Sequence, residues 1–133
     1  MRRILVAEDN VMIGLVVTAD LERAGYAVDG PFMRNAQALD AANAARPDLA
    51  LVDIDLQGGD SGIDLARALR AEFGVPSVFV TGQAGPAKAA RDDALGVLIK
   101  PFRGSVLIET VAAALELAAG GAKPDDAHGR IWF

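Results

Sequence analysis

The sequence contains no cysteine, and this absence narrows the chemistry that the protein can perform. Disulfide frameworks, thiolate metal sites and cysteine nucleophiles are all excluded. Histidine is almost as scarce: the single residue, His128, has no metal-ligand spacing around it, so we expect it to be a surface residue. Any metal site in this chain must therefore use oxygen ligands.

The sequence also lacks an excess of basic residues and lacks any long hydrophobic run. The net charge of −5 disfavours direct binding to nucleic acid or to an anionic membrane, because neither polyanion attracts an acidic partner. No apolar stretch approaches the roughly 18 residues of a membrane helix, and Met1–Ile4 leads directly into a short strand rather than a signal peptide. We therefore expect a cytoplasmic protein.

Hydrophobic residues account for 52% of the 133 residues, enough for one globular domain with a substantial core. Strand-like apolar runs alternate with helical stretches. The expected strands are 4–7, 26–29, 49–53, 75–80 and 96–99, and the expected helices are 11–24, 35–46, 63–73, 87–93 and 105–119. This alternation predicts a doubly wound α/β fold with a five-stranded parallel sheet and right-handed crossovers.

Local signals refine this prediction. Gly30-Pro31 is expected to end the second strand, and Asn35 is expected to cap the helix that follows. The helix at 87–93 has a weak apolar face and little room before Lys100, so it should be short or irregular.

From Gly120 onward Gly, Ala, Lys, Pro and Asp dominate, which predicts a flexible tail over 120–133 after a domain of residues 1–119. The tail nevertheless ends in Ile131-Trp132-Phe133. We expect these three apolar residues either to fold back onto the domain or to dock on a partner.

Polar side chains follow four of the five expected strands. They are Glu8 and Asp9 after the first strand, Asp53 and Asp55 after the third, Thr81 after the fourth and Lys100 after the fifth. The carboxyl ends of parallel strands share one edge of a sheet, so we expect these groups to converge there. Converging carboxylates repel one another and favour a bound cation.

Oxygen ligands select a hard cation, and Mg²⁺ fits best because it needs few protein carboxylates and retains water or phosphate oxygens; Ca²⁺ or Mn²⁺ could substitute. An aspartate at such a site can attack phosphorus and form an aspartyl phosphate. Asp53 ends the apolar run and is better held than Asp55, so Asp53 is the predicted nucleophile.

Taken together, these residues resemble the receiver domain of two-component response regulators, over about residues 3–119. The resemblance implies a flavodoxin-like fold with strand order 2-1-3-4-5. It further implies that a sensor histidine kinase donates a phosphoryl group to Asp53. Mg²⁺ would be held by Glu8, Asp9, Asp53 and the backbone carbonyl of Asp55.

The resemblance assigns the remaining site residues as well. Thr81 would bond a phosphoryl oxygen, Lys100 would pair with the phosphate, and the Lys100-Pro101 peptide would be cis. Receivers usually carry an aromatic residue three positions before the lysine, and Val97 replaces it here. Phe79-Val80-Thr81-Gly82 resembles the Phe-Ala-Thr-Gly segment of a branch of stand-alone alphaproteobacterial receivers.

No output domain follows Ala119, so the sequence predicts a signalling phosphoacceptor that acts through protein contact or phosphorelay rather than a metabolic enzyme. Its expected partners are the kinase and a downstream regulatory or phosphotransfer protein. Because Val97 is too small to act as the usual aromatic lever, we expect phosphorylation to order 82–90, whose surface with the fifth strand and last helix would meet partners.

Two alternatives compete with this interpretation. Asp53-Ile54-Asp55 matches part of the nucleophile motif of haloacid-dehalogenase-type phosphohydrolases, although that family places it on the first strand and its metal acids after the lysine. A pseudo-receiver, a binding module with a vestigial site, is disfavoured because every expected site residue is present.

Overall fold

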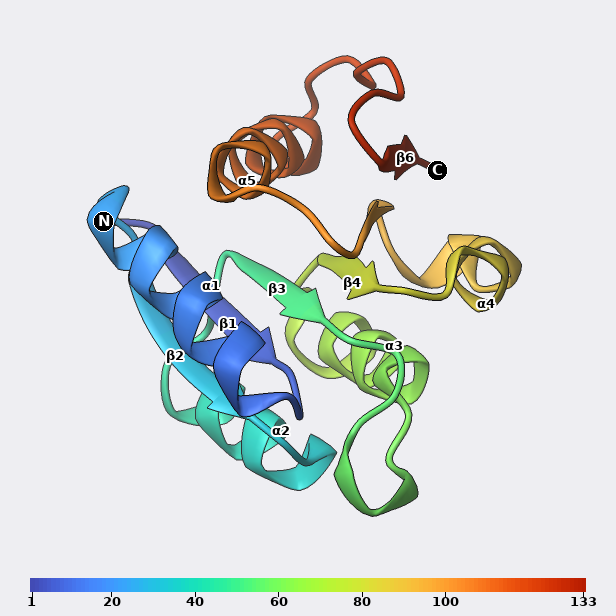
Figure 1. The fold of residues 1–133 in the computed structure, drawn as a ribbon. Helices are drawn as coiled ribbons and strands as arrows, with labels where there is room; N and C mark the ends of the chain where they lie inside the picture. The colour runs from blue at the N-terminus through green and yellow to red at the C-terminus, as the bar shows by residue number, and fades with distance from the viewer.

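The computed structural model describes all 133 residues, which form one sheet with helices on both faces (Figure 1). The strands are β1 (Arg3–Ala7), β2 (Ala27–Phe32), β3 (Leu49–Val52), β4 (Ser77–Thr81), β5 (Gly96–Ile99) and β6 (Arg130–Trp132). The α-helices are α1 (Val11–Arg23), α2 (Asn35–Ala44), α3 (Gly62–Phe73), α4 (Ala84–Ala89) and α5 (Gly104–Ala118), and the 3₁₀ turns are η1 (Gln57–Gly59) and η2 (Arg91–Asp93). No helix is long and apolar enough to cross a membrane.

The strand order is β2-β1-β3-β4-β5-β6, and the first five strands are parallel. The predicted doubly wound fold and the order of its first five strands are therefore confirmed. Alternating strand residues face opposite layers: Ile4 and Val6 pack toward α1 and α5, whereas Leu5 and Ala7 pack toward α2 and α3. The fourth helix is short, as predicted, and η2 follows it.

The second strand differs from the prediction, because β2 continues through Gly30-Pro31 instead of ending there. Gly30 has φ 119°, and a side chain would meet the Val6 carbonyl oxygen, with its Cβ 2.4 Å away. Only glycine tolerates both the positive φ and this contact, so the strand passes the irregularity and pairs again at Phe32.

Asn35 is not the cap of α2, as the sequence suggested, but its first helical residue. The backbone N–H of Asn35 donates to Asp60 Oδ2 at 2.8 Å, so a carboxylate from the loop before α3 satisfies this helix end. That hydrogen bond holds the pKa of Asp60 below its ordinary value, with Arg34 assisting. A cap 25 positions away in the sequence carries no local signal.

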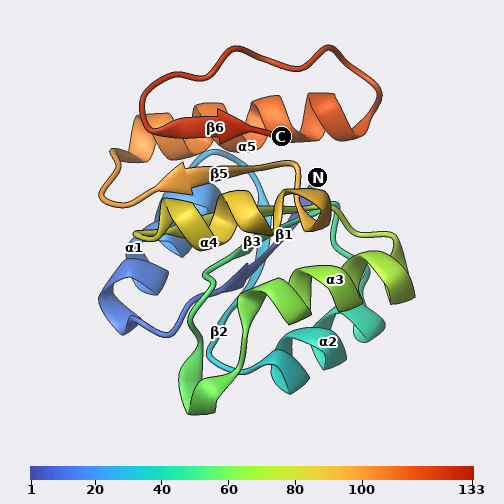
Figure 2. The ribbon, with the colours of Figure 1, turned by 90° about the vertical axis from the view of Figure 1, so that its right-hand side faces the viewer.

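The end of the predicted flexible tail is a strand, so the sheet has six strands rather than five (Figure 2). β6 pairs with β5 antiparallel, with Trp132 opposite Gly96. Ile131 and Phe133 pack on the α4 side of the sheet, and Trp132 packs on the α5 side. The expectation that Ile131-Trp132-Phe133 fold back onto the domain is therefore confirmed. The strand itself was not predicted, because three residues are too few for a reliable alternating pattern.

Candidate functional site

Strands β1, β3, β4 and β5 bring the polar residues of the sequence prediction to one edge of the sheet. The parallel register pairs Ala7 with Val52, Val52 with Phe79 and Thr81 with Ile99. Glu8 and Asp53, which follow β1 and β3, therefore emerge at the same height, whereas β4 and β5 end two residues further along the sheet. Glu8, Asp53 and Thr81 are buried at this edge, and Asp9 is exposed.

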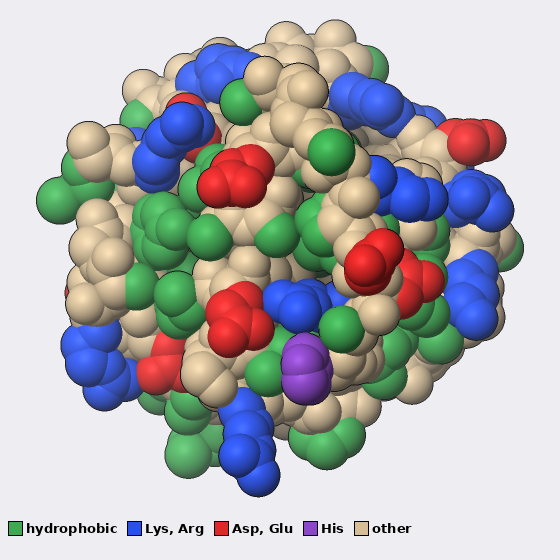
Figure 3. Space-filling view, turned by 90° about the horizontal axis from the view of Figure 1, so that it is seen from above, with side chains coloured by type: hydrophobic (Ala, Val, Ile, Leu, Met, Phe, Trp, Pro, Cys, Tyr) green, Lys and Arg blue, Asp and Glu red, His purple; other side chains and the backbone are tan.

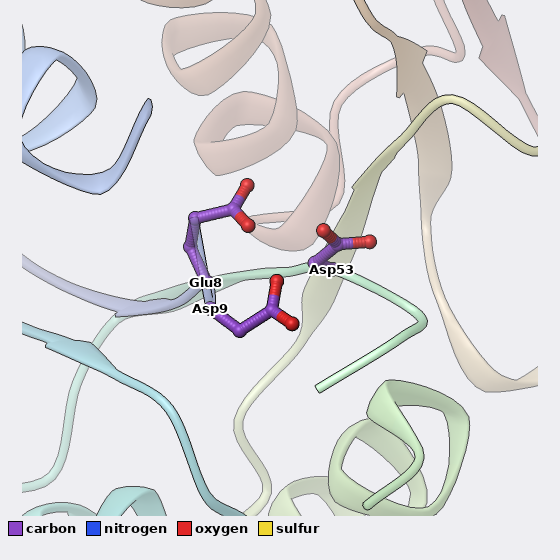
Figure 4. A group of neighbouring side chains, drawn as sticks. All are labelled: Glu8, Asp9 and Asp53. Carbon is purple, nitrogen blue, oxygen red and sulfur yellow. The ribbon is translucent and has the colours of Figure 1, made fainter. Parts of the chain in front are cut away.

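Three carboxylates form the centre of the site. Carboxylate oxygens of Glu8, Asp9 and Asp53 lie within 4.8 Å of one another, and Figure 4 shows the three side chains gathered at the ends of β1 and β3. The exposed Asp9 leaves the group open to solvent. Three oxygen donors with one open side suit a hard divalent cation that keeps water or phosphate oxygens among its ligands.

Lys100 supplies the positive charge of the site. Its Nζ donates to Asp53 Oδ2 at 2.8 Å and also to Glu8 Oε1. Burial opposes the charged form of Lys100, but these hydrogen bonds outweigh it, so the pKa of Lys100 is raised. The ammonium therefore remains charged and neutralises part of the carboxylate repulsion.

Burial raises the pKa of Glu8, although hydrogen bonds from Lys100 and from the backbone of Asn10 oppose the shift. Sequence reasoning missed Asn10, which has two roles. Its Oδ1 accepts the N–H of Ile13 at 3.0 Å and caps α1, while its own N–H donates to Glu8 Oε2 at 3.1 Å. An asparagine directly before a helical stretch is the signal that could have revealed it.

Asp55 lies apart from the carboxylate group. Its side chain is exposed and accepts a hydrogen bond from Gln83 Nε2, and its backbone N–H donates to Asp53 Oδ1 at 3.4 Å. Its expected backbone contact with a metal stays a prediction. Gln83, which the sequence analysis did not single out, thus links the loop after β3 to the beginning of α4.

Thr81 ends β4 with a buried hydroxyl that accepts the N–H of Gln83 at 3.2 Å. The Thr81 carbonyl accepts the N–H of Lys100 at 2.9 Å, which joins the fourth and fifth strand ends. A hydroxyl held by one local bond can re-orient toward a new acceptor more readily than one fixed in a network.

Gly62 fixes the loop that carries Asp53. A Cβ on Gly62 would lie 1.7 Å from the Asp53 carbonyl oxygen, so any side chain would displace that backbone. The Gly62 N–H donates to the Ile54 carbonyl at 2.7 Å. The adjacent Ser61 caps α3 through its side chain, and this serine before a helix was the available sequence signal.

An apolar pocket of 270 Å³ adjoins the site. It is lined by Met12, Ile13, Val16, Val17, Lys100, Pro101 and Phe102. The Lys100-Pro101 peptide at its margin is cis, as the resemblance implied. Val11, Met12, Leu15 and Val16 are more than half exposed on α1. An apolar helix face beside a polar site is the usual composition of a protein docking surface.

The model of the response regulator receiver domain matches residues 4–112 of this sequence. The chain belongs to the response regulator receiver domain family. This membership decides against the phosphohydrolase alternative, and it fits an acidic cluster with a lysine at the carboxyl edge of the sheet.

Relatives of the receiver family share this fold. The DNA-binding response regulator MtrA of Mycobacterium tuberculosis is 36% identical over 122 residues, which cover 86% of this chain and 50% of MtrA. The chain thus spans about half the length of the curated relatives it matches. The receiver domain of NtrX from Brucella abortus superposes with a TM-score of 0.78 at 30% identity, covering 85% of this chain and 98% of that domain. The chemotaxis response regulator CheY4 of Vibrio cholerae gives 0.75 at 28%, covering 84% and 97%.

Proposed function

We propose that this receiver accepts a phosphoryl group on Asp53 from a sensor histidine kinase and that the phosphorylated form signals through contact with another protein. The observation that carries the proposal is the Lys100 ammonium bridging Asp53 and Glu8 within a group of three carboxylates. Response regulators of this family work with sensor histidine kinases, which supplies the class of donor.

The carboxylates fit Mg²⁺. Glu8, Asp9 and Asp53 offer oxygen ligands from two neighbouring strands, and the exposed side leaves room for water and phosphate oxygens. When bound, Mg²⁺ would neutralise negative charge on the transferring phosphoryl oxygens. Lys100 offsets part of the same carboxylate charge and holds the Asp53 side chain in place beside the metal ligands.

Transfer would form one bond and break one. An Asp53 carboxylate oxygen attacks phosphorus, the P–N bond to the donor imidazole breaks, and its electron pair stays on that nitrogen, which takes up a proton. Lys100 then pairs with the phosphoryl group and the Thr81 hydroxyl donates to one of its oxygens. Both side chains already lie at this edge of the sheet.

The exposed apolar face of α1 supports docking of the phosphodonor protein. Met12 and Val16 line the pocket that adjoins Lys100 and Pro101, so a protein seated there would be held beside the acceptor carboxylate. The net charge of −5 does not favour a direct nucleic-acid partner.

Mass mapping after reaction with acetyl phosphate and Mg²⁺ tests the proposal. We expect the label on Asp53, loss of labelling in Asp53→Asn, and retained labelling in the matched control Asp55→Asn. Chelation of the metal should stop the reaction. Labelling at Asp55, or equal labelling after chelation, would overturn the assignment.

A further inference from the structure

The C-terminal strand covers the edge of the sheet that would otherwise be open. β6 lies along β5 between α4 and α5 (Figure 2). Beyond the ladder, the Ile99 N–H donates to the Gly129 carbonyl at 2.9 Å and the Phe133 N–H donates to the Leu95 carbonyl at 3.0 Å. The backbone groups of β5 that a free edge would present are thus paired by the chain's own end.

The β5 edge has a shape that fits this strand closely. A Cβ on Gly96 would lie 2.6 Å from the Ile131 carbonyl oxygen and 2.9 Å from the Trp132 ring. Gly96 therefore keeps open the space that β6 occupies. On one side Trp132 is 4% exposed against the α5 layer, and on the other Ile131 and Phe133 pack around the buried Val97.

Several features indicate that this strand can leave its seat. It is three residues long, it is joined to α5 by residues 119–129, and it lies outside the region that the family model matches. The Trp132 indole Nε1–H is buried without a hydrogen-bond partner, which costs free energy only while the strand is docked. The surface over α5 and this segment mixes acidic, basic and hydrophobic side chains (Figure 3).

The seat of β6 is connected to the phosphorylation site through α4. Ile131 and Phe133 belong to the same cluster as Phe79, Val97 and Ala87, and Ala87 lies on α4. Helix α4 begins two residues after Gly82, and its N-terminal flank is tied to Thr81 and Asp55 through Gln83. Arg91 adds a contact, with its guanidinium 6.0 Å above the Phe133 ring.

We propose that the β5 edge is a docking groove for an extended strand of a partner protein, that the chain's own Arg130–Phe133 fills it at rest, and that phosphorylation of Asp53 opens it. The partner strand runs antiparallel to β5 and carries apolar or aromatic side chains on both faces, because the groove here holds Trp132 on the α5 side and Ile131 and Phe133 on the α4 side. The opening step rests on the proposed function. The groove and its occupant do not.

The C-terminal strand also bears on the predicted partner surface. Partners were expected from the sequence to meet the surface formed by 82–90, the fifth strand and the last helix. In the structure the C-terminal strand covers the edge between those elements. A partner can therefore bind this edge only after the strand has been displaced or released.

The groove is tested without phosphorylation, using the full chain. Trp132 is the only tryptophan, so its emission and its quenching by acrylamide report the seat of β6 directly. Ile131→Asp should undock the strand, shift emission to longer wavelength and let a labelled synthetic peptide of residues 124–133 bind with at least tenfold higher affinity than to wild type. The control Ala122→Asp adds the same charge to the exposed linker and should change nothing.

Gly96→Ala separates release from binding. It should also expose Trp132, but the peptide should not bind, because the new methyl group blocks the groove. Circular dichroism verifies that each variant is folded. The docking groove is refuted if Trp132 is exposed in Ile131→Asp but the peptide does not bind. It is also refuted if the peptide binds wild type and Gly96→Ala as strongly as it binds Ile131→Asp. If Trp132 stays buried in Ile131→Asp, the position of β6 against β5 is refuted.

Phosphorylation is then tested on the same readouts. Wild type treated with acetyl phosphate and Mg²⁺ should show more Trp132 quenching and stronger peptide binding, with intact mass confirming the label in the same sample and Asp53→Asn as control. If the protein is labelled but Trp132 stays buried, only the opening of the groove by phosphorylation is refuted. If the protein is not labelled, the proposed function is refuted, and the existence of the groove is still judged from the Ile131→Asp experiment.

Discussion

At the scale of single residues, Lys100 decides how charge is arranged at the site. It contacts Asp53 and Glu8 before any phosphate is present, so its ammonium lies close enough to pair with a phosphoryl group on Asp53. A lysine ammonium is a compact point charge, whereas the planar guanidinium of arginine would need more room between these two partners.

We predict that Lys100→Arg accepts phosphate but responds weakly to it. The arginine keeps the positive charge, but its larger side chain prevents the close ion pair with the phosphoryl group on which the response depends. Amide exchange over 82–90, measured with and without acetyl phosphate and Mg²⁺, should show added protection in wild type and little in the variant. Intact mass controls for labelling, and equal protection in both proteins would contradict this role.

Glu8 gives the metal-free protein a predicted pH dependence. Burial raises its pKa above the ordinary value of 4.5, so the folded state holds this proton more tightly than the unfolded chain. The resulting stability is fully present below pH 4.5 and is lost as pH rises through the folded-state pKa. In Glu8→Gln this loss should be absent. Urea unfolding of both proteins in EDTA, from below pH 4.5 upward, measures their free energies of unfolding. If the wild type becomes more stable relative to the variant as the pH rises, the raised pKa of Glu8 is refuted.

At the scale of elements, glycines set how firmly the loops around the site are held. Gly62 lies against the Asp53 backbone at the start of α3, whereas Gly85 lies in α4 with open space around it. The same added methyl group should therefore cost far more at Gly62 than at Gly85.

We predict that Gly62→Ala destabilises the protein by about 1–3 kcal/mol, because the methyl group forces the Asp53 carbonyl to move. It should also slow phosphorylation by misplacing the nucleophile. Gly85→Ala should change the stability by less than about 1 kcal/mol, because the helical preference of alanine is offset by the Pro86 ring, which disfavours helical backbone in the residue before it. Chemical unfolding measures both, and a neutral Gly62→Ala would contradict the tight contact.

At the scale of the whole molecule, metal binding and folding are linked. The carboxylates of Glu8, Asp9 and Asp53 are brought together only when β1 and β3 pair, so the unfolded chain lacks the site. A ligand that binds only the folded state stabilises it by an amount that depends on its concentration relative to Kd.

We predict that Mg²⁺ raises Tm, with a stabilisation of about 2.7 kcal/mol at one hundred times Kd. Asp9→Asn should lose most of this effect, because it removes the exposed ligand, whereas Asp40→Asn, an exposed acid on α2, should keep it. Thermal unfolding with magnesium chloride and with sodium chloride of equal ionic strength separates binding from screening. Equal shifts in Asp9→Asn and wild type would exclude this site.

The first five strands, their helices and the residues that converge at their carboxyl ends could all be predicted from the sequence. Those features follow from hydrophobic periodicity and from the rule that parallel strands share one edge, both of which are local patterns read along the chain. Asp53, Glu8 and Lys100 were identified in this way, as was the short fourth helix.

Features that depend on contacts between distant segments could not be predicted in this way, because no local pattern encodes them. The Asp60 carboxylate caps α2, and Gly30 carries β2 past the Val6 carbonyl. The end of the chain is the clearest case. Arg130–Trp132 has too few residues for a periodic signal, and it is ordered because the β5 edge offers unpaired backbone groups and a glycine-lined seat that appear only after the other five strands have assembled.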